Sequence, residues 1–290
     1  TLKLWVPDGS APEDLGENVE LIEREALADT PLILFLESID HARQTANLLG
    51  DVVSGRHVVV HASRDIEVDS LKTVSTILRE ETATHRIGFI TGPMRGVDVQ
   101  QGSSASATVY SRFPEVHEFL VETLVSPTFR LYRSKELQAA EIAAAYSRVI
   151  AFVWGVAAGM QQGASVGATL FARGLAEIGR VVSAHGGSER AVFGMSGAGN
   201  LFADVQAPVA VEAEMGKAAV KLGDFEVEQM EEKFGESARR LYDLIGVCSR
   251  LCQETGIEGR IAKAAAAMVS NEMDTLEAAK FLMTLPVLDE

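Results

Sequence analysis

The stretch IAAAYSRVIAFVWGVAAGM, residues 142–160, decides how the second half of this chain folds. It is about as long as a bilayer span. Arg148 lies near its middle and alanine is frequent around it, and both features make insertion into a membrane costly. A helix that is hydrophobic on all sides is otherwise found in a protein core. We therefore expect a buried central helix here and no membrane span.

Helical periodicity continues on both sides of this stretch, from about Lys135 to Leu282. Alanine-rich segments follow one another with few interruptions. Glycines at positions 163, 186–187, 194–199 and 256 separate them, and glycines in such places are typical of turns between helices. The pattern predicts an all-helical domain over residues 135–290.

Residues 1–134 have a different pattern. Short apolar runs, such as PLILFL at 31–36 and HVVVHA at 57–62, alternate with helical segments. Continuous apolar runs are typical of strands buried on both faces, and their alternation with helices predicts a mostly parallel sheet with helical crossovers. We expect a Rossmann-like α/β domain that ends near Ser134.

Charge and cysteine content exclude several kinds of site. The 290 residues carry a net charge of −15, which repels nucleic-acid phosphates, so no nucleic-acid partner is expected. Cys248 and Cys252 are four residues apart, a spacing that suits neither a disulfide framework nor a zinc site. We expect a soluble protein of a reducing compartment that has no metal site, with its histidines at strand or helix edges rather than as ligands.

The stretch GMSGAGNLFADVQAPVAVEAEMG, residues 194–216, has the glycines of an anion site without its side chains. No lysine, arginine, serine or threonine follows the glycines before Lys217. No strand precedes them either, so they are a weak dinucleotide signal. No G-x-G-x-x-G occurs in the first half of the chain. These glycines are better explained by a tight turn between helices.

Several stretches, taken in order, resemble the NAD(P)-dependent glycerol-3-phosphate dehydrogenase family. They are ITGPMRGVDV at 90–99, SPTFRLYRS at 126–134, AEIAAAYSRVIAFVWGVAAGM at 140–160 and TLFARGLAEIGR at 169–180. The resemblance implies a Rossmann-like domain and a helical domain of the 6-phosphogluconate dehydrogenase-like type. It also implies that the first sheet strand and its G-x-G-x-x-G lie outside this chain or are missing. NAD(P) binding is therefore expected only if the gene encodes that segment upstream of Thr1.

The same resemblance places substitutions where the family carries out its chemistry. Ser147 stands where the family has the lysine that takes the hydroxyl proton, and a serine is a poor base without an activator. Arg64 replaces a second family lysine, and Asn200 replaces an aspartate. Arginine keeps the charge but cannot accept a proton. These three positions are predicted to be degenerate catalytic positions.

The substrate-binding and cofactor-binding positions follow from the resemblance too. Where the family grips the substrate phosphate with S-R-N, this chain has Ala210, Val211 and Glu212, and a glutamate there would repel a dianion. Pro93 and Arg173 match retained positions and are the candidates for cofactor contact. For Arg173, a structural ion pair is an equally good explanation.

These substitutions favour a catalytically degenerate relative that acts as a structural or interaction subunit. Two alternatives stay open: an active NAD(P)-dependent oxidoreductase on another, non-phosphorylated alcohol, and a glycerol-3-phosphate dehydrogenase with a rearranged site. If the first strand is missing, the sheet has an unpaired edge, which proteins normally cover. We expect a protein partner, a second copy of the chain or an upstream segment to cover it, unless the sheet re-pairs around the gap.

Overall fold

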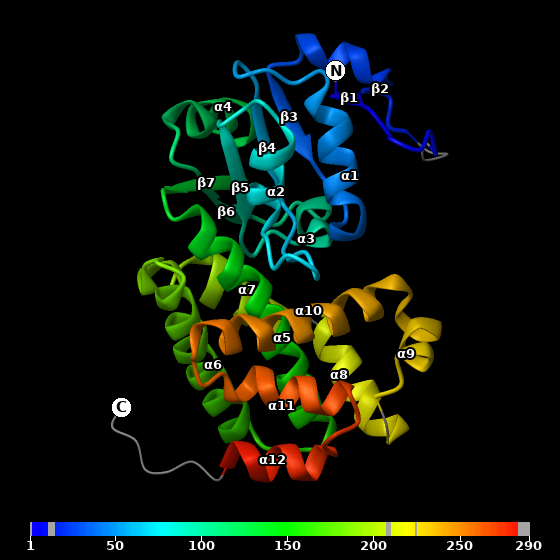
Figure 1. The fold of residues 1–290 in the computed structure, drawn as a ribbon, viewed down its shortest axis with the longest axis vertical. Coiled ribbons are helices and arrows are strands. Elements are labelled where there is room, and N and C mark those ends of the chain that lie inside the picture. The colour runs from blue at the N-terminus through cyan, green and yellow to red at the C-terminus, as the bar shows by residue number, and fades with distance from the viewer. Residues whose placement is uncertain (1, 11–14, 207–209, 224, 284–290) are drawn as a thin grey trace.

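The computed structural model describes residues 2–10, 15–206, 210–223 and 225–283. Figure 1 shows an α/β part above a helical part. In the α/β part, a sheet of five strands has the order β3-β4-β5-β6-β7. The strands are β3 (Leu32–Phe35), β4 (Val58–His61), β5 (Ile87–Thr91), β6 (Ala105–Tyr110) and β7 (Phe129–Ser134). All neighbouring pairs are parallel except β5 and β6, which are antiparallel. The predicted Rossmann-like, mostly parallel sheet is confirmed.

Helices cover both faces of this sheet. They are α1 (Ile39–Gly50), α2 (Val74–Glu81), the short α3 (Gly96–Gln100) and α4 (Pro114–Leu124). Val59 of β4 packs into one core cluster with residues of α1 and α2. Its neighbours Val58 and Val60 pack into another cluster with residues of α4. Because successive side chains of a strand point to opposite faces, the apolar run of β4 fills both cores.

The first strands form a separate small sheet. β1 (Leu2–Leu4) pairs in parallel with β2 (Val19–Leu21), and the 3₁₀ helix η1 (Arg24–Asp29) follows. Among the described residues, β3 pairs only with β4, so β3 is an edge of the large sheet. Leu34 is 39% exposed and Leu36 is 74% exposed there. No strand in the described part of the chain pairs with β3 on the side away from β4, so β3 has an unpaired edge there.

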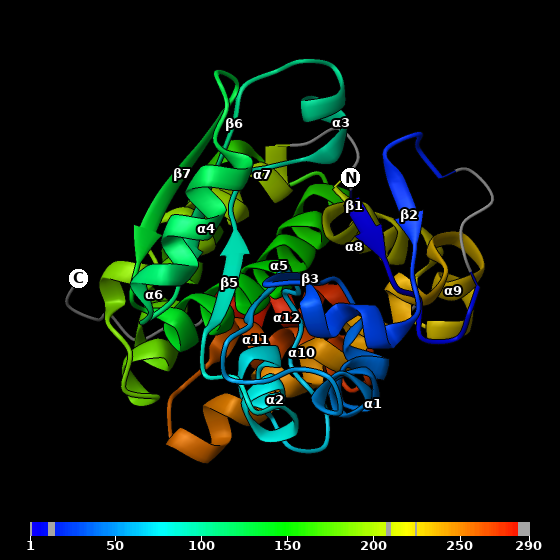
Figure 2. The same ribbon diagram turned by 90° about the horizontal axis from the view of Figure 1, so that it is seen from above.

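The helical part is built around α5 (Leu137–Gly159). Figure 2 shows α5 running beneath the sheet, with other helices around it. Although α5 is long and apolar enough to cross a membrane, 72% of its most apolar window is buried inside the protein, as expected for a core helix. The remaining elements are α6 (Ala164–Ala184), η2 (Glu189–Ala191), a π-helical turn η3 (Met195–Gly199), α7 (Asn200–Gln206), α8 (Val211–Leu222), α9 (Val227–Phe234), α10 (Glu236–Thr255), α11 (Arg260–Val269) and α12 (Thr275–Met283).

Glycines let α5 and α8 approach each other closely. A Cβ atom at Gly155 would lie 2.1 Å from the carbonyl oxygen of Ala213, and one at Gly216 would lie 2.3 Å from that of Phe152. Neither contact is possible for a larger residue without moving one helix. This contact fixes α8, and with it Glu212, against the middle of α5.

Candidate functional site

The loop after β4 meets the middle of α5 through Arg64. Arg64 Nη2 donates a hydrogen bond to Ser147 Oγ over 2.9 Å, and Arg64 Nε donates to the carbonyl oxygen of Ala144 over 3.3 Å. Ser147 is fully buried, and its hydroxyl donates to the same carbonyl over 2.9 Å. The hydroxyl proton and an oxygen lone pair of Ser147 are both in use. No activating base is among these partners.

Asp204 of α7 holds the other side of the Arg64 guanidinium. The two side chains form a double contact, Nη2 to Oδ2 at 2.5 Å and Nη1 to Oδ1 at 3.2 Å. Arg64 is 22% exposed and Asp204 is 16% exposed. A planar guanidinium matches a carboxylate in this geometry, which holds both side chains in place.

Arg148, the residue after Ser147, forms a second buried cluster. It makes ion pairs with Asp65 and with Glu212, where Nε lies 2.7 Å from Oε1. Burial by itself lowers the pKa of Arg148, but the charges of Asp65 and Glu212 outweigh it and raise that pKa. Burial raises the pKa of Glu212, but the charges of Arg148 and Arg64, together with its hydrogen bonds, outweigh burial and bring that pKa below its ordinary value of 4.5. Glu212 is therefore a carboxylate held by a buried cation.

Together these residues form what we call the interdomain ion-pair network. It consists of Arg64, Asp65, Ser147, Arg148, Asp204 and Glu212. Two arginines face three carboxylates, so the network has one more negative than positive charge. Among the described residues, neither a lysine nor a histidine bonds to it. The network can tie the loop after β4 to α5, α7 and α8, but it offers no group that accepts a proton near neutral pH.

Asn200 lies beside the network, at the start of α7. Its Nδ2 donates to Thr91 Oγ1 over 2.9 Å and to the carbonyl oxygen of Ser196 over 3.1 Å. Asn200 is only 2% exposed. The side chain thus links α7 to the carboxyl end of β5.

The three positions at the start of α8 differ in their surroundings. Ala210 is buried just before the helix and Val211 is 43% exposed, and neither carries a polar side-chain group. Only Glu212 joins the network. The structure therefore brings Arg64, Ser147 and Glu212 together, with Asn200 nearby, as the resemblance implied.

The glycines of residues 194–199 are packed, as the turn interpretation requires. A Cβ atom at Gly197 would lie 2.2 Å from the carbonyl oxygen of Val192. One at Gly199 would lie 3.5 Å from Cδ of Pro93. Backbone from the same chain fills the space at Gly197, so this turn is not an open cradle for an anion.

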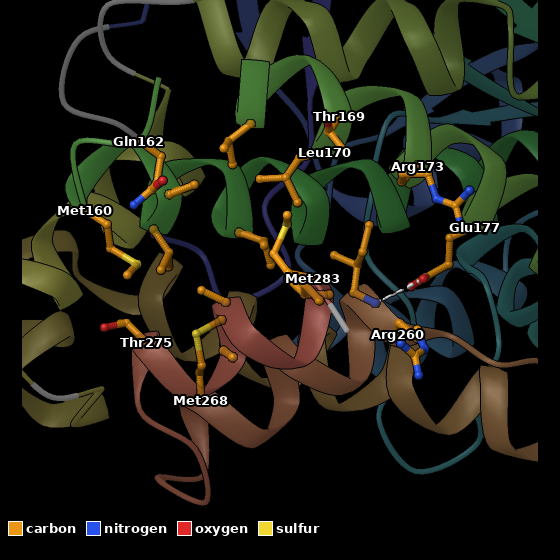
Figure 3. Close-up of a pocket in the computed structure, with 18 of the residues that line it drawn as sticks. Met160, Gln162, Thr169, Leu170, Arg173, Glu177, Arg260, Met268, Thr275 and Met283 are labelled. Atoms are coloured by element: carbon orange, nitrogen blue, oxygen red, sulfur yellow. Dashed lines mark hydrogen bonds between the residues drawn. The ribbon is translucent and has the colours of Figure 1, made fainter. Parts of the chain in front are cut away.

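Pro93 and Arg173, the two candidates for cofactor contact, lie in different surroundings. Pro93 follows β5 and lies against the turn at Gly199. Arg173 lies on α6 and lines a cavity formed with α5, α11 and α12, to which Pro93 does not contribute (Figure 3). The structure does not bring the two into one site, and a cofactor role for either residue stays a prediction.

Three histidines, His57, His61 and His117, are buried, whereas His41 and His85 are exposed. His61 ends β4 but is fully buried, with Nε2 3.2 Å from Glu141 Oε1. Glu141 also accepts hydrogen bonds from the backbone and hydroxyl of Ser75, at 2.9 and 2.5 Å. The described residues contain no cluster of three or more potential metal ligands. Glu141 therefore links α5 to the start of α2 through Ser75, and His61 lies against Glu141 without a hydrogen bond among the described residues.

The sequence analysis did not single out Asp65 or Asp204. The sequence contains a signal for such acidic partners, because Arg148 interrupts an otherwise apolar helix. A buried arginine requires acidic partners, and Asp65 comes directly after the Arg64 position. The location of Asp204 could not be inferred in this way, because it depends on how α7 packs.

Comparison with known proteins identifies relatives along nearly the whole chain. The family model for the N-terminus of NAD-dependent glycerol-3-phosphate dehydrogenase matches residues 3–116, and the model for its C-terminus matches residues 136–280. The glycerol-3-phosphate dehydrogenase [NAD(P)+] of Sinorhizobium fredii is 30% identical over 288 residues, which cover 98% of this chain and 83% of that protein. The enzyme of the same name from Agrobacterium fabrum is 27% identical, with 98% and 84% covered.

Solved structures support the same fold. The crystal structure of glycerol-3-phosphate dehydrogenase from Coxiella burnetii superposes with a TM-score of 0.85 at 18% identity, covering 93% of this chain and 82% of that one. A structure of the Plasmodium falciparum enzyme gives a TM-score of 0.84 at 12% identity, with 93% and 78% covered. Because the family models and the sequence matches extend over nearly the whole chain, the chain belongs to the NAD-dependent glycerol-3-phosphate dehydrogenase family.

Proposed function

We propose that this chain is a glycerol-3-phosphate dehydrogenase-like protein that does not oxidise glycerol 3-phosphate and acts as a structural or interaction subunit. The observation that carries this proposal is the interdomain ion-pair network. It occupies the positions where the resemblance puts the proton acceptor and the phosphate grip.

The proton acceptor is the first reason. Oxidation of an alcohol needs a group that takes the hydroxyl proton as hydride leaves. Ser147 at this position donates its proton to a carbonyl and accepts from Arg64. The arginines of the network cannot take over this role, because a guanidinium is not a proton acceptor near neutral pH. Loss of a general base typically lowers the rate by about 10²–10⁴-fold.

The charge of the network is the second reason. A dianionic phosphate next to Glu212 would meet a carboxylate that is already ionised and held in place by Arg148. Repulsion between two unit charges 4 Å apart is about 1 kcal/mol in water and several times that near a partly buried site. Both arginines already have carboxylate partners, so neither is available to the phosphate without breaking a buried pair.

The glycine turn before α7 does not fit the pyrophosphate of a dinucleotide. Binding of this group needs a glycine turn whose backbone is open to the ligand at a helix N-terminus. At the glycine turn before α7, the carbonyl oxygen of Val192 lies only 2.2 Å from the position that a Cβ atom of Gly197 would take. We therefore expect NAD(P) binding only if a segment upstream of Thr1 supplies such a turn, and titration of the full-length gene product tests this.

The decisive experiment is a dehydrogenase assay on the full-length gene product. Glycerol 3-phosphate with NAD⁺ or NADP⁺, and dihydroxyacetone phosphate with NADH or NADPH, are followed at 340 nm (about the reduced nicotinamide maximum), with the Sinorhizobium fredii enzyme as positive control. We expect turnover at least about 10³-fold below the control. Reduction of NAD⁺ at a comparable rate, with product confirmed, would refute the proposal.

Two further measurements separate the alternatives. Oxidation of a non-phosphorylated alcohol in the same assay would favour an active oxidoreductase on another substrate. Calorimetric titration with NAD(H) and NADP(H) tests cofactor binding independently of turnover. Saturable binding without turnover is compatible with a degenerate enzyme, whereas binding with turnover is not.

The edge of β3 supports the interaction role. Leu34 and Leu36 are exposed where the strand has a free edge, and exposed apolar edges normally pair with another chain or are covered. We expect another protein chain, in the first instance a second copy, to cover this edge. Sedimentation velocity should show a species larger than the 31.1 kDa monomer. Leu36→Lys should dissociate it, and Val125→Lys, exposed beyond α4, should not.

A further inference from the structure

The helical part contains a cavity of about 720 Å³ that is separate from the interdomain ion-pair network. It lies between α5, α6, α11 and α12 (Figure 3). Its lining is mainly apolar and includes Val153, Val156, Leu170, Ile257, Leu276 and Leu282. The volume is within the range of pockets that bind small molecules.

Three methionines surround the apolar end of the cavity. Met160 comes from the end of α5, Met268 from α11 and Met283 from α12. Methionine side chains are unbranched and polarizable, so they adapt to flexible apolar ligands. This end suits an alkyl chain better than a rigid polar molecule.

The opposite end of the cavity is cationic. Arg173, Arg180 and Arg260 line it, together with Glu177 and Glu258. Figure 3 shows Arg173, Glu177 and Arg260 close together, away from Met160 and Thr275. Three arginines against two glutamates leave one excess positive charge in a protein whose net charge is −15.

The acidic groups at this end are already engaged. Glu177 accepts a hydrogen bond from Tyr146 at 2.6 Å and from the backbone N–H groups of Ile261 and Ala262 at about 3.0 Å. Glu258 pairs with Arg260 Nε at 2.8 Å. The carboxylate of Glu177 therefore points to the start of α11, and none of its hydrogen bonds comes from an arginine.

Donors of the arginines remain free. Arg260 Nη1 is buried and has no hydrogen-bond partner among the described residues. With the residues that the structure describes, neither Arg173 nor Arg180 makes a hydrogen bond or an ion pair. A buried guanidinium donor without an acceptor is unfavourable, so an anionic group at this end would be stabilised.

From these features we propose that the cavity binds an amphipathic carboxylate, such as a medium-chain fatty acid. The carboxylate lies between Arg173 and Arg260, and the alkyl chain extends toward Met268 and Met160. Charge complementarity selects the carboxylate, and burial of methylene groups provides most of the affinity. This binding does not depend on the proposed loss of dehydrogenase activity.

The test is calorimetric titration of the full-length chain with dodecanoate below its micellar concentration. We expect saturable binding with one site per chain. Decanoate should bind about tenfold more weakly, because two methylene groups fewer are buried. Dodecan-1-ol, which lacks the charge, should also bind at least about tenfold more weakly, and dodecyltrimethylammonium should not bind.

Variants locate the binding. Arg173→Gln and Arg260→Gln should each weaken dodecanoate binding at least about tenfold. Ala279→Trp, which adds bulk to the cavity from the half-exposed face of α12, should abolish it. Arg239→Gln is the matched control, since Arg239 is exposed on α10, pairs with Glu231 and does not line the cavity. Circular dichroism checks that each variant is folded.

Three results would overturn the proposal. The first is no saturable binding of dodecanoate. The second is equal binding of dodecanoate and dodecan-1-ol. The third is dodecanoate binding that a folded Ala279→Trp variant leaves unchanged.

Discussion

Arg64 donates from Nη2 to Ser147 Oγ over 2.9 Å, and the same nitrogen lies 2.5 Å from Asp204. A buried hydroxyl therefore lies in direct contact with a cation that has its own counter-ion. A lysine introduced at position 147 would put a second positive charge against this guanidinium, away from water.

We predict that Ser147→Lys destabilises the protein by about 2–4 kcal/mol, through burial of an unpaired charge and repulsion from Arg64. Urea unfolding at neutral pH measures it. Ser183→Lys, on the exposed face of α6, is the control and should change stability by less than about 0.5 kcal/mol. If Ser147→Lys unfolds at the same urea concentration as the wild type, the contact with Arg64 is not maintained in solution.

Arg148→Met removes the cation shared by Asp65 and Glu212. Both carboxylates would stay buried with less compensation, so we expect a loss of about 3–5 kcal/mol in the free energy of unfolding. Arg239→Met breaks an exposed pair with Glu231 and should cost no more than about 1 kcal/mol. In a double-mutant cycle with Glu212→Gln, the effects should be less than additive. Strict additivity would contradict the pairing.

Stability should depend on pH through Glu212. Its pKa in the folded protein is lowered, against the effect of burial, by the charges of Arg148 and Arg64. A lowered pKa means that the ionised form stabilises the fold, so the contribution is complete above the ordinary value of 4.5 and is lost as the pH falls through the folded-state pKa.

The measurement compares wild type with Glu212→Gln in urea from about pH 7 to about pH 3. The difference in unfolding free energy should be constant near neutrality and shrink in the acidic range. Glu228→Gln, on the exposed face of α9, serves as the control variant. If the difference in unfolding free energy instead grows as the pH falls, the ionised form of Glu212 does not stabilise the fold.

The contact between α5 and α8 predicts opposite outcomes for two glycine substitutions. Gly216→Ala would place a methyl group 2.3 Å from the carbonyl oxygen of Phe152, so the helices must separate. We expect a loss of about 1–3 kcal/mol. Gly246→Ala, within α10, meets nothing within 4 Å and should stabilise by up to about 1 kcal/mol. Thermal unfolding of both variants tests this. Equal melting temperatures would rule out the close contact.

The alternation of apolar runs and helical segments was enough to predict the sheet and the helical part. The apolar runs expected as strands, at 31–36 and 57–62, contain β3 and β4. β2 was missed because Val19–Leu21 is short and follows a polar stretch. The antiparallel direction of β6 was not predicted either, since it depends on chain path rather than on side-chain pattern.

The site was less predictable than the fold. The resemblance located Arg64, Ser147 and Glu212, but residue types alone did not show that Glu212 is held by Arg148. The cavity lined by Arg173 was not foreseen, because it forms between helices that are distant in the sequence. Spacing along a helix predicts which residues share a face, but it does not tell which other helix that face meets.

The position of Arg148 on α5 has a mechanical consequence. Hinge bending that opened the space between the sheet and the helices would pull Asp65 away from Arg148 and Arg64 away from Asp204. Each of these separations exposes or strands a buried charge. The two halves are thus fastened to one another, and calorimetry should record a single cooperative heat-absorption peak for both.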